Sequence, residues 1–183
     1  PGNIVDIIND EGEPTKPGEV GDIAVHSSTP ALFQGYLKDP ERTKMQYRGD
    51  WYLTGDRAYK DEEGYFWFEG RGDDIIISSG YTIGPFEVED ALVKHPAVKE
   101  CAVVASPDEI RGNIVKAYVV LRDPVLKDSP TIVQELQEHV KNTTAPYKYP
   151  RAIEFIDELP KTASGKIRRV ELRQREQSKV LNK

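Results

Sequence analysis

Short apolar runs separated by turn residues make up the first 70 positions of the chain. Such runs, with Gly, Asp and Asn clusters between them, are typical of strands joined by turns. One helix is expected among them, because Asp39 is a good N-cap, Pro40 suits the first helical position and Glu41 complements the positive end of the helix. The expected strands lie at residues 4–8, 21–25, 51–53 and 64–68. This part therefore predicts a small antiparallel β-rich subdomain.

The pattern changes after the segment Gly70-Arg71-Gly72-Asp73-Asp74. From there strands and amphipathic helices alternate over about 110 residues, which indicates a compact α+β domain. Apolar positions recur at helical spacing in two of these helices; they are Val88, Ala91, Leu92 and His95 in the first, and Ile132, Val133, Leu136 and Val140 in the second. The expected strands are 75–77, 102–105, 114–121 and 152–156, and the expected helices are 85–95, 131–141 and 170–177.

The change from a strand-and-turn pattern to alternating strands and helices predicts two domains joined by one hinge. Residues 1–70 are interpreted as the β-rich end of a larger domain, because the chain runs into an apolar strand almost at its first residue. Residues 71–74 are the expected hinge, since glycine and paired aspartates permit a change of chain direction. Residues 75–183 form the expected α+β domain.

Composition excludes several classes of protein. Apolar residues make up 38% of the 183 positions and charged residues 31%, and no run approaches the ~20 apolar residues of a membrane span. A single cysteine, Cys101, excludes an internal disulfide framework and is expected to be an inert buried residue. The three histidines are too scattered to predict a metal centre and are expected to be packing or surface residues. Trp51, Trp67 and Phe68 are expected in the core.

The net charge of −6 is unevenly distributed. Residues 141–183 hold 11 Lys and Arg against 5 Asp and Glu, whereas residues 1–140 hold 14 against 26. A basic tail on an acidic body indicates an anionic partner. Because acidic residues are interleaved in the tail, a small phosphate-bearing molecule is favoured over nucleic acid.

Four motifs, in this order and spacing, resemble the carboxy-terminal third of the acyl-adenylate-forming superfamily, which includes acyl-CoA synthetases, luciferase and peptide-synthetase adenylation domains. They are residues 51–56 (WYLTGD), 70–76 (GRGDDII), 78–89 (SSGYTIGPFEVE) and 160–167 (PKTASGKI). The segment YKYP at 147–150 and its flanks look most like a mitochondrial medium-chain acyl-CoA synthetase. The resemblance covers essentially the whole chain, and it implies that the α+β domain is the mobile lid of such an enzyme.

The resemblance implies a role in nucleotide chemistry for three of the residues in these motifs. The residue matching Asp56 holds the ribose hydroxyls of ATP or AMP, and the one matching Arg71 contacts the nucleotide. The residue matching Lys166 performs the adenylation step, in which an ammonium stabilises charge on the transferring oxygens. Asp73 matches the hinge position about which the lid swivels. Thr82 stands where many relatives carry an arginine against the phosphate, so it keeps one hydroxyl donor and lacks the charge.

A second set of residues is implied in binding coenzyme A. The turn Ser79-Gly80-Tyr81 matches the position against the pantetheine arm, where glycine allows a close approach of the backbone. Cationic and aromatic positions match those that hold the nucleotide end of CoA in close relatives; they are Arg111, Lys141, Tyr149, Pro150 and Arg151.

The implied function is that of an ATP-dependent carboxylic acid–CoA ligase, AMP-forming, in the mitochondrial matrix, with ATP, CoA and Mg²⁺ as cofactors. The Gly/Ser/Thr-rich phosphate loop and the Tyr-Gly-x-Thr-Glu segment of the superfamily are absent from these residues. The metal ligands and the acyl pocket are therefore expected outside this chain, in an N-terminal domain of the same enzyme, and this chain alone is expected to be inactive. Two alternatives remain open: a non-catalytic module that binds nucleotide or CoA, and another adenylate-forming enzyme such as an aryl-CoA ligase.

Overall fold

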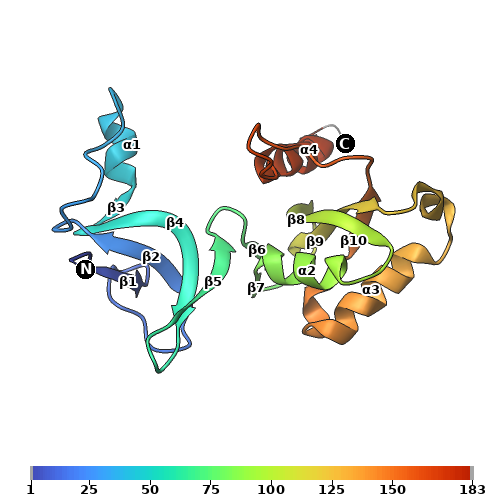
Figure 1. The fold of residues 1–183 in the computed structure, drawn as a ribbon, viewed down its shortest axis with the longest axis horizontal. Helices are drawn as coiled ribbons and strands as arrows, with labels where there is room; N and C mark the ends of the chain where they lie inside the picture. Colours follow the sequence, from blue (N-terminus) through green and yellow to red (C-terminus); the bar gives the residue numbers. More distant parts are fainter. Residues whose placement is uncertain (1, 182–183) are drawn as a thin grey trace. The chain divides into compact units, whose positions relative to one another are not determined.

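The computed structural model describes residues 2–181. The chain divides into two compact units, Pro1–Asp73 (unit 1) and Asp74–Lys183 (unit 2) (Figure 1). Each unit has its own sheet and its own buried residues. Together they give the mixed α+β architecture that the sequence predicts, with an antiparallel β-rich part followed by a compact α+β part.

Unit 1 is an antiparallel sheet of five strands, four of which lie in the order β1-β2-β4-β3. The fifth strand, β5, pairs with residues 56–60 of β4. Its buried core is small and consists of Ile7, Ile8, Ala24 and Ala58. The strands are β1 (Val5–Ile8), β2 (Gly21–His26), β3 (Tyr47–Arg48), β4 (Trp51–Lys60) and β5 (Phe66–Arg71). The expected strands are therefore present, although β4 is much longer than the apolar run that predicted it.

The helix of unit 1, α1 (Pro40–Met45), begins where its capping residues predict. The Asp39 side chain accepts a hydrogen bond from the Arg42 backbone N–H at 3.0 Å, and Pro40 occupies the first turn. Because no residue of α1 is buried, its sequence-local caps rather than packing define where it starts.

Two expectations about the core of unit 1 are wrong. Trp67 and Phe68 are 53% and 54% exposed, because they lie on β5, which pairs with β4 alone. The Trp67 indole instead donates a hydrogen bond to Asp61 at 2.7 Å. The apolar run at 4–8 is buried only in its second half, since Ile4 is 52% exposed. Trp51 is half-buried and contacts His26 edge to face.

Unit 2 is built on a three-stranded sheet in which β9 lies between β8, antiparallel to it, and β10, parallel to it. A separate two-stranded hairpin, β6–β7, precedes the sheet. The strands are β6 (Ile76–Ser78), β7 (Tyr81–Ile83), β8 (Val98–Asp108), β9 (Gly112–Leu121) and β10 (Ala152–Phe155). The helices are α2 (Pro85–Val93), α3 (Ile132–Thr143) and α4 (Arg169–Leu181), with short 3-10 turns η1 (Pro124–Asp128) and η2 (Pro146–Lys148).

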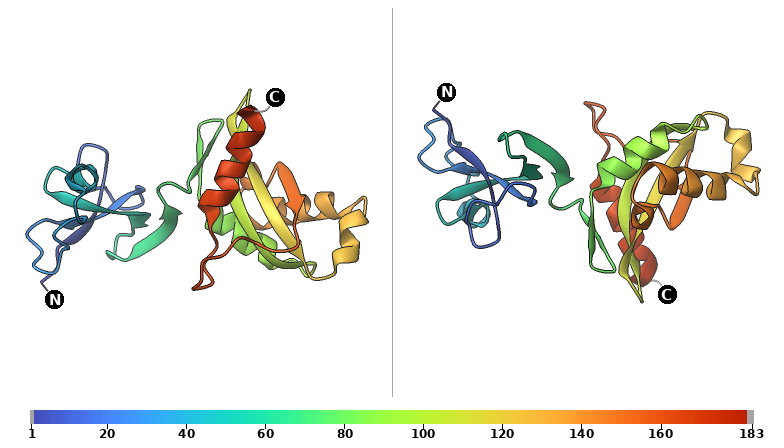
Figure 2. Two further views of the ribbon diagram at one scale, coloured as in Figure 1. Left: turned by 90° about the horizontal axis from the view of Figure 1, so that it is seen from above. Right: turned by 90° about the horizontal axis from the view of Figure 1, so that it is seen from below.

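Helices cover both faces of the sheet of unit 2. Figure 2 shows α2 and α3 on one face and α4 on the other. Alternate residues of β8 and β9 belong to two separate clusters, because successive side chains of a strand point to opposite faces. Val103 and Val119 belong to the cluster that contains residues of α2 and α3, whereas Val104 and Tyr118 pack with Leu172 of α4.

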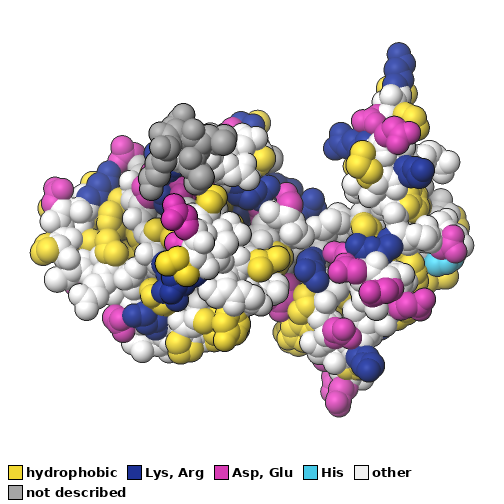
Figure 3. All heavy atoms as spheres, turned by 180° about the vertical axis from the view of Figure 1, so that it is seen from behind, with side chains coloured by type: hydrophobic (Ala, Val, Ile, Leu, Met, Phe, Trp, Pro, Cys, Tyr) yellow, Lys and Arg dark blue, Asp and Glu magenta, His cyan; other side chains and the backbone are white. Residues whose placement is uncertain are grey.

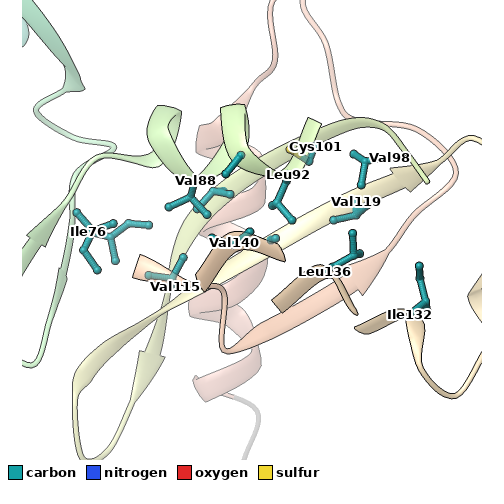
Figure 4. Close-up of a cluster of buried hydrophobic side chains, with 14 of the residues drawn as sticks. Ile76, Val88, Leu92, Val98, Cys101, Val115, Val119, Ile132, Leu136 and Val140 are labelled. Atoms are coloured by element: carbon teal, nitrogen blue, oxygen red, sulfur yellow. The ribbon is translucent and has the colours of Figure 1, made fainter. Parts of the chain in front are cut away.

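The face under α2 and α3 forms the main hydrophobic core of unit 2 (Figure 4). The residues expected to point inward do so with two exceptions. Val133 is 36% exposed, and His95 lies beyond the end of α2 and is half-buried. The buried helical residues are Val88, Ala91 and Leu92 of α2, and Ile132, Leu136 and Val140 of α3.

Helix α4 is held to its face of the sheet largely by charged groups. Glu176 is 3% exposed and accepts hydrogen bonds from Lys116 of β9 and Ser106 of β8, each at 2.7 Å. The Tyr118 hydroxyl and Lys179 also donate to it. Burial alone would raise the pKa of Glu176, but these hydrogen bonds outweigh burial and lower its pKa to about 2. The helix expected to be merely polar thus carries a buried carboxylate.

Cys101 and the histidines have structural surroundings. Cys101 is 4% exposed, as expected for an inert residue, and burial followed by the nearby Glu89 raises its pKa to about 12. His95 and His139 meet edge to face with ring centroids 5.1 Å apart, which their separation in sequence does not suggest. In the part of the chain from residue 2 to residue 181, no helix is long and apolar enough to cross a membrane.

Candidate functional site

In unit 1 the two residues expected at the nucleotide face each other across a strand pair. Asp56 of β4 and Arg71 of β5 are register partners, and the Arg71 Nη1 lies 3.1 Å from Asp56 Oδ1. The same nitrogen is 3.4 Å from the Thr54 carbonyl oxygen. Asp56 is 36% exposed and Arg71 is 49% exposed, so both keep surface for a ligand. In such a pair the carboxylate can accept hydrogen bonds from ribose hydroxyls, and the planar guanidinium can donate hydrogen bonds to a phosphate.

Gly55 allows this arrangement. Its φ is +82°, a left-handed conformation that L side chains rarely adopt. A Cβ atom at this position would lie 2.9 Å from Nη2 of Arg71, so a side chain would displace the guanidinium. The Gly55 carbonyl also accepts a hydrogen bond from the Gly72 N–H at 2.9 Å. Glycine at position 55 therefore lets the arginine lie flat against the backbone of β4.

The two adjacent aspartates at the predicted hinge have different partners. Asp73, 61% exposed at its side chain, lies 3.6 Å from Arg71 Nε in unit 1. Asp74, 8% exposed, pairs with Arg173 and, at 3.9 Å, with Arg169, both from α4 in unit 2. The hinge itself stays a prediction.

In unit 2 the predicted pantetheine turn joins β6 to β7. Ser79 and Gly80 have φ values of +50° and +81°, the combination that a tight two-residue hairpin turn requires. An ideal Cβ on Gly80 meets nothing within 4 Å, so open space adjoins the turn. The Ser79 N–H donates to the Arg111 carbonyl at 3.2 Å and brings the β8–β9 connection beside the turn. Thr82 is exposed on β7, opposite Ile77.

Three of the predicted CoA residues form a compact group of cations around one aromatic ring. Lys141 Nζ lies 4.5 Å and the Arg151 guanidinium carbon 4.9 Å from the centre of the Tyr149 ring. Arg151 Nη1 also donates to the Tyr149 hydroxyl at 2.8 Å. Pro150 is buried, and its carbonyl accepts a hydrogen bond from Gln137 at 3.0 Å, which fixes the backbone between Tyr149 and Arg151. The group places two cations on an ordered backbone, and one of them, Lys141, also pairs with Glu138 at 2.6 Å.

Lys166 lies in a small closed loop of unit 2, next to the residue that closes it. An isolated β-bridge joins Lys161 to Ile167, and the Lys166 carbonyl and N–H bond to the backbone N–H and the hydroxyl of Thr162 at 2.8 and 3.1 Å. Gly165, with a φ of +82°, forms the turn. The Lys166 side chain is exposed, and among residues 2–181 its ammonium has no hydrogen-bonding or ionic partner. The backbone is fixed while the amine is available.

Many other cations of the basic tail are neutralised within unit 2. Figure 3 shows acidic and basic side chains interspersed on one face of the molecule. Lys161 pairs with Glu100 at 2.7 Å, and Arg175 pairs with Glu154 at 2.8 Å. The tail therefore offers an anion a few particular cations rather than a continuous positive stripe, which agrees with a small phosphate-bearing ligand better than with nucleic acid.

One residue at this surface was missed by the sequence analysis. The ring of Tyr147 stacks on the ring of Tyr81, with centroids 4.3 Å apart and planes 20° from parallel. The signal available was the spacing Tyr-x-Tyr at 147–149, which is too common to single out either ring. In the part of the chain that the structure describes, no group of three or more His, Cys, Asp and Glu side chains is arranged to hold a metal ion.

Comparisons with known proteins identify the class to which this fold and these motifs belong. Residues 87–166 match the AMP-binding enzyme C-terminal domain. The chain belongs to the acyl-adenylate-forming superfamily, within its acyl-CoA ligases. This confirms the expected family and fold class.

Among curated proteins, the chain is 75% identical over all its 183 residues to the uncharacterized acyl--CoA ligase YtcI of Bacillus subtilis (strain 168), of which it covers 34%. It is 57% identical to acyl-coenzyme A synthetase ACSM3, mitochondrial, of Rattus norvegicus over 94% of its own length and 30% of that protein. The chain thus spans about a third of the length of the curated relatives it matches.

Solved structures agree with this assignment. The anthranilate CoA ligase AuaEII in complex with anthranoyl-AMP is 39% identical, with a TM-score of 0.82 over 96% of this chain and 33% of that one. ATP-bound MatB from Rhodopseudomonas palustris is 30% identical, with a TM-score of 0.83 over 96% of this chain and 34% of that one.

Proposed function

We propose that the protein carrying this chain is an ATP-dependent carboxylic acid–CoA ligase that works in two steps. In the first, a carboxylate attacks the α-phosphorus of ATP, which gives acyl-AMP and releases pyrophosphate. In the second, the CoA thiol attacks the acyl carbon and releases AMP. Membership of the acyl-CoA ligases and the arrangement of the candidate residues support this proposal.

The Asp56–Arg71 pair is proposed to hold the nucleotide. An ionised carboxylate accepting hydrogen bonds from ribose hydroxyls makes hydrogen bonds of roughly 1.5–3 kcal/mol each, and Arg71 holds the Asp56 carboxylate in place. Gly55 leaves the space that the guanidinium occupies. We assign no Mg²⁺ ligand to residues 2–181, since no suitable cluster is found there.

Lys166 is proposed as the catalytic residue of the first step. The observation that carries this assignment is its exposed ammonium, without a partner among the described residues, on a loop whose backbone is closed by hydrogen bonds. Such a cation can approach the carboxylate and the α-phosphate together and stabilise the charge that builds on the transferring oxygens. Rotation about Asp73 is proposed to bring Lys166 of unit 2 to the nucleotide for this step. A second orientation is proposed to bring the Gly80 turn there for the second step.

The second step is proposed to use the surface around the Gly80 turn. The pantetheine arm would pass the open side of Gly80, and the cation group of Lys141, Tyr149 and Arg151 would hold the phosphates of CoA, with Arg111 beside the turn. Thr82 belongs to the proposed nucleotide site and would offer the adenylate phosphate a single hydroxyl, where many relatives carry an arginine.

Separating the two half-reactions tests the role of Lys166. Lys166→Ala in the complete ligase is expected to slow adenylation by about 10²–10³, the usual effect of losing one well-placed donor, while formation of thioester from supplied acyl-AMP is unchanged. Lys161→Ala is the matched control, because Lys161 lies in the same loop but is paired with Glu100. Equal slowing of both half-reactions by Lys166→Ala would show that the lysine acts on the fold and not on adenylation.

A second candidate is a binding module that holds AMP or CoA without turnover. It is supported by the groups that the chain itself carries, namely the Asp56–Arg71 pair for a nucleotide and the cations around Tyr149 for the phosphates of CoA. Calorimetry with AMP and CoA on these 183 residues, beside an activity assay of the longer protein, distinguishes the two. Binding together with turnover only in the longer protein supports the ligase, and binding with no turnover in either supports the module.

For the acid itself we propose a medium-chain fatty acid, with an aryl acid as the alternative. The resemblance of residues 147–150 and their flanks to a medium-chain acyl-CoA synthetase supports the first, and the likeness to an anthranilate CoA ligase supports the second. A panel of both acid classes with the complete ligase decides between them. The expected mitochondrial location is not part of the proposal, because the relative at 75% identity is bacterial and the relatives named mitochondrial are mammalian.

A further inference from the structure

We propose that Tyr147 is a positioning residue for coenzyme A: by stacking on Tyr81 it holds the Ser79–Gly80 turn in the shape that accepts the pantetheine arm. The inference rests on the proposed function, since it concerns the same CoA surface. It adds a residue and a physical reason that the sequence motifs do not contain.

The stack is a surface contact and not part of the core. Tyr81 is 52% exposed and Tyr147 is 39% exposed, although their rings lie nearly parallel with centroids 4.3 Å apart. Two large aromatic rings left on the surface would each be free to change rotamer. Stacked, each restricts the other, so the direction of the Tyr81 side chain is determined by residue 147.

Tyr147 is itself well fixed. It lies in η2, where the Lys148 N–H bonds to the Ala145 carbonyl at 2.9 Å. The Lys148 ammonium pairs with Glu87 of α2 and lies 5.7 Å from the Tyr147 ring centre. Two residues further on, Tyr149 is the centre of the cation group. One short segment therefore contacts the turn at one end and carries the proposed phosphate-binding cations at the other.

The stack supports the side of the turn that has fewer other contacts, because buried Ser78 and the Asn113 side chain on the Ile77 carbonyl, at 3.4 Å, hold the β6 side. The β6–β7 hairpin has three residues in each strand, and a two-stranded hairpin of that size is marginal by itself. Ser79 adopts a φ of +50° without being glycine, which costs conformational energy. Ile76 and Ile83 anchor the base of the hairpin, and the Ser79–Arg111 hydrogen bond anchors one side of the turn. The Tyr81–Tyr147 stack supports the other strand where it leaves the turn.

The chemistry of the ligand explains why the direction of Tyr81 matters. The pantetheine arm is narrow and carries amides, so it needs an unobstructed backbone surface, and the open space at Gly80 provides one. A Tyr81 ring released from the stack can rotate toward that space. Loss of Tyr147 is therefore expected to impair CoA binding without altering the nucleotide site in unit 1.

The test measures CoA and AMP affinities of the 183-residue chain by calorimetry. Tyr147→Ala is expected to weaken CoA binding by between about twofold and tenfold, the range for loss of one aromatic pair. Tyr147→Phe keeps the ring and is expected to restore wild-type affinity. AMP affinity is expected to be the same in all variants. Hydrogen exchange at the Ser79 N–H, measured without ligand, is expected to be faster in Tyr147→Ala alone.

Tyr81→Ala and the double variant complete a cycle that separates the stack from independent contacts. If Tyr147 acts through Tyr81, the double variant binds CoA no more weakly than Tyr81→Ala. Additive losses, or a Tyr147→Ala chain that binds CoA as tightly as wild type, would overturn the inference and leave the proposed function standing. A wild-type chain that binds no CoA would overturn the proposed CoA surface and the inference with it.

Discussion

Replacing Glu176 by glutamine removes the charge at the centre of the polar cluster that binds α4 to the sheet. The carboxylate is 3% exposed and accepts hydrogen bonds from Lys116, Ser106, Tyr118 and Lys179. Glutamine has almost the same shape but no charge, and its amide nitrogen cannot accept. Lys116 then keeps Glu154, at 2.7 Å, as its negatively charged partner, while the glutamine oxygen offers it only a neutral acceptor.

The pKa of Glu176 provides the magnitude. The surrounding hydrogen bonds lower the pKa from 4.5 to about 2 in spite of burial. Each pKa unit corresponds to roughly 1.4 kcal/mol, so ionised Glu176 stabilises the folded state by about 3 kcal/mol at neutral pH. Removing one partner of a buried ion pair costs a similar amount, about 3–5 kcal/mol. We therefore expect Glu176→Gln to lower the free energy of unfolding of unit 2 by about 3 kcal/mol.

The same linkage fixes the pH dependence. Because folding lowers the pKa, the stabilisation is complete above pH 4.5 and is lost as the pH falls toward 2. The difference between wild type and variant should thus be largest at neutral pH and shrink in acid. Urea unfolding followed by far-UV circular dichroism measures it, since α2, α3 and α4 all belong to unit 2.

Tryptophan fluorescence gives an internal control, because both tryptophans, Trp51 and Trp67, belong to unit 1. The fluorescence transition should not change in the variant. A change in unfolding free energy below about 0.5 kcal/mol, the usual effect of an unimportant surface substitution, would refute the reasoning. So would a difference that stays constant between neutral pH and the acid range.

Two further predictions concern Gly55 and His95. Gly55→Ala is expected to displace Arg71 and to weaken AMP binding by the 183-residue chain in calorimetry. Gly64→Ala is the control, because Gly64 has the same kind of φ (+86°) but nothing lies within 4 Å of the added Cβ, so this variant should destabilise unit 1 without weakening AMP binding. Equal AMP affinities in both variants would count against the role of Gly55. Burial, then neighbouring His139, lowers the pKa of His95 below 6.5, so wild-type unit 2 should lose stability as the pH falls below the unfolded-state value of 6.5. His95→Gln should flatten that dependence in circular dichroism, and an unchanged slope would exclude His95 as its source.

The sequence predicted the helices of unit 2 well because their signals are local. Apolar spacing located α2 and α3 to within about two residues at each end, the ordinary uncertainty of helix boundaries. It failed for Trp67 and Phe68, since an aromatic run indicates a strand but not whether anything packs on that strand. Helical spacing was also misleading for Val133, which is 36% exposed, because one apolar position at that spacing can lie at the edge of the buried face.

The buried charges were beyond prediction for a different reason. Lys116 and Glu176 are far apart in sequence, and a charged residue is normally assumed to be exposed. The available signal was weak: Lys116 interrupts the apolar run of β9, and Glu176 follows buried Leu172 at a spacing of one helical turn. For the candidate site, the motifs supplied the residues, but only coordinates could show that Arg71 faces Asp56 or that Tyr147 meets Tyr81.

The isolation of Cys101 makes this protein easy to label. A thiol that is 4% exposed and has a pKa of about 12 remains protonated and inaccessible to maleimide reagents. A cysteine introduced on the surface of each unit would then be modified alone, with no need to remove the native one. A dye pair attached at two such positions would report directly, by energy transfer, whether the distance between the two units changes when nucleotide or CoA is added.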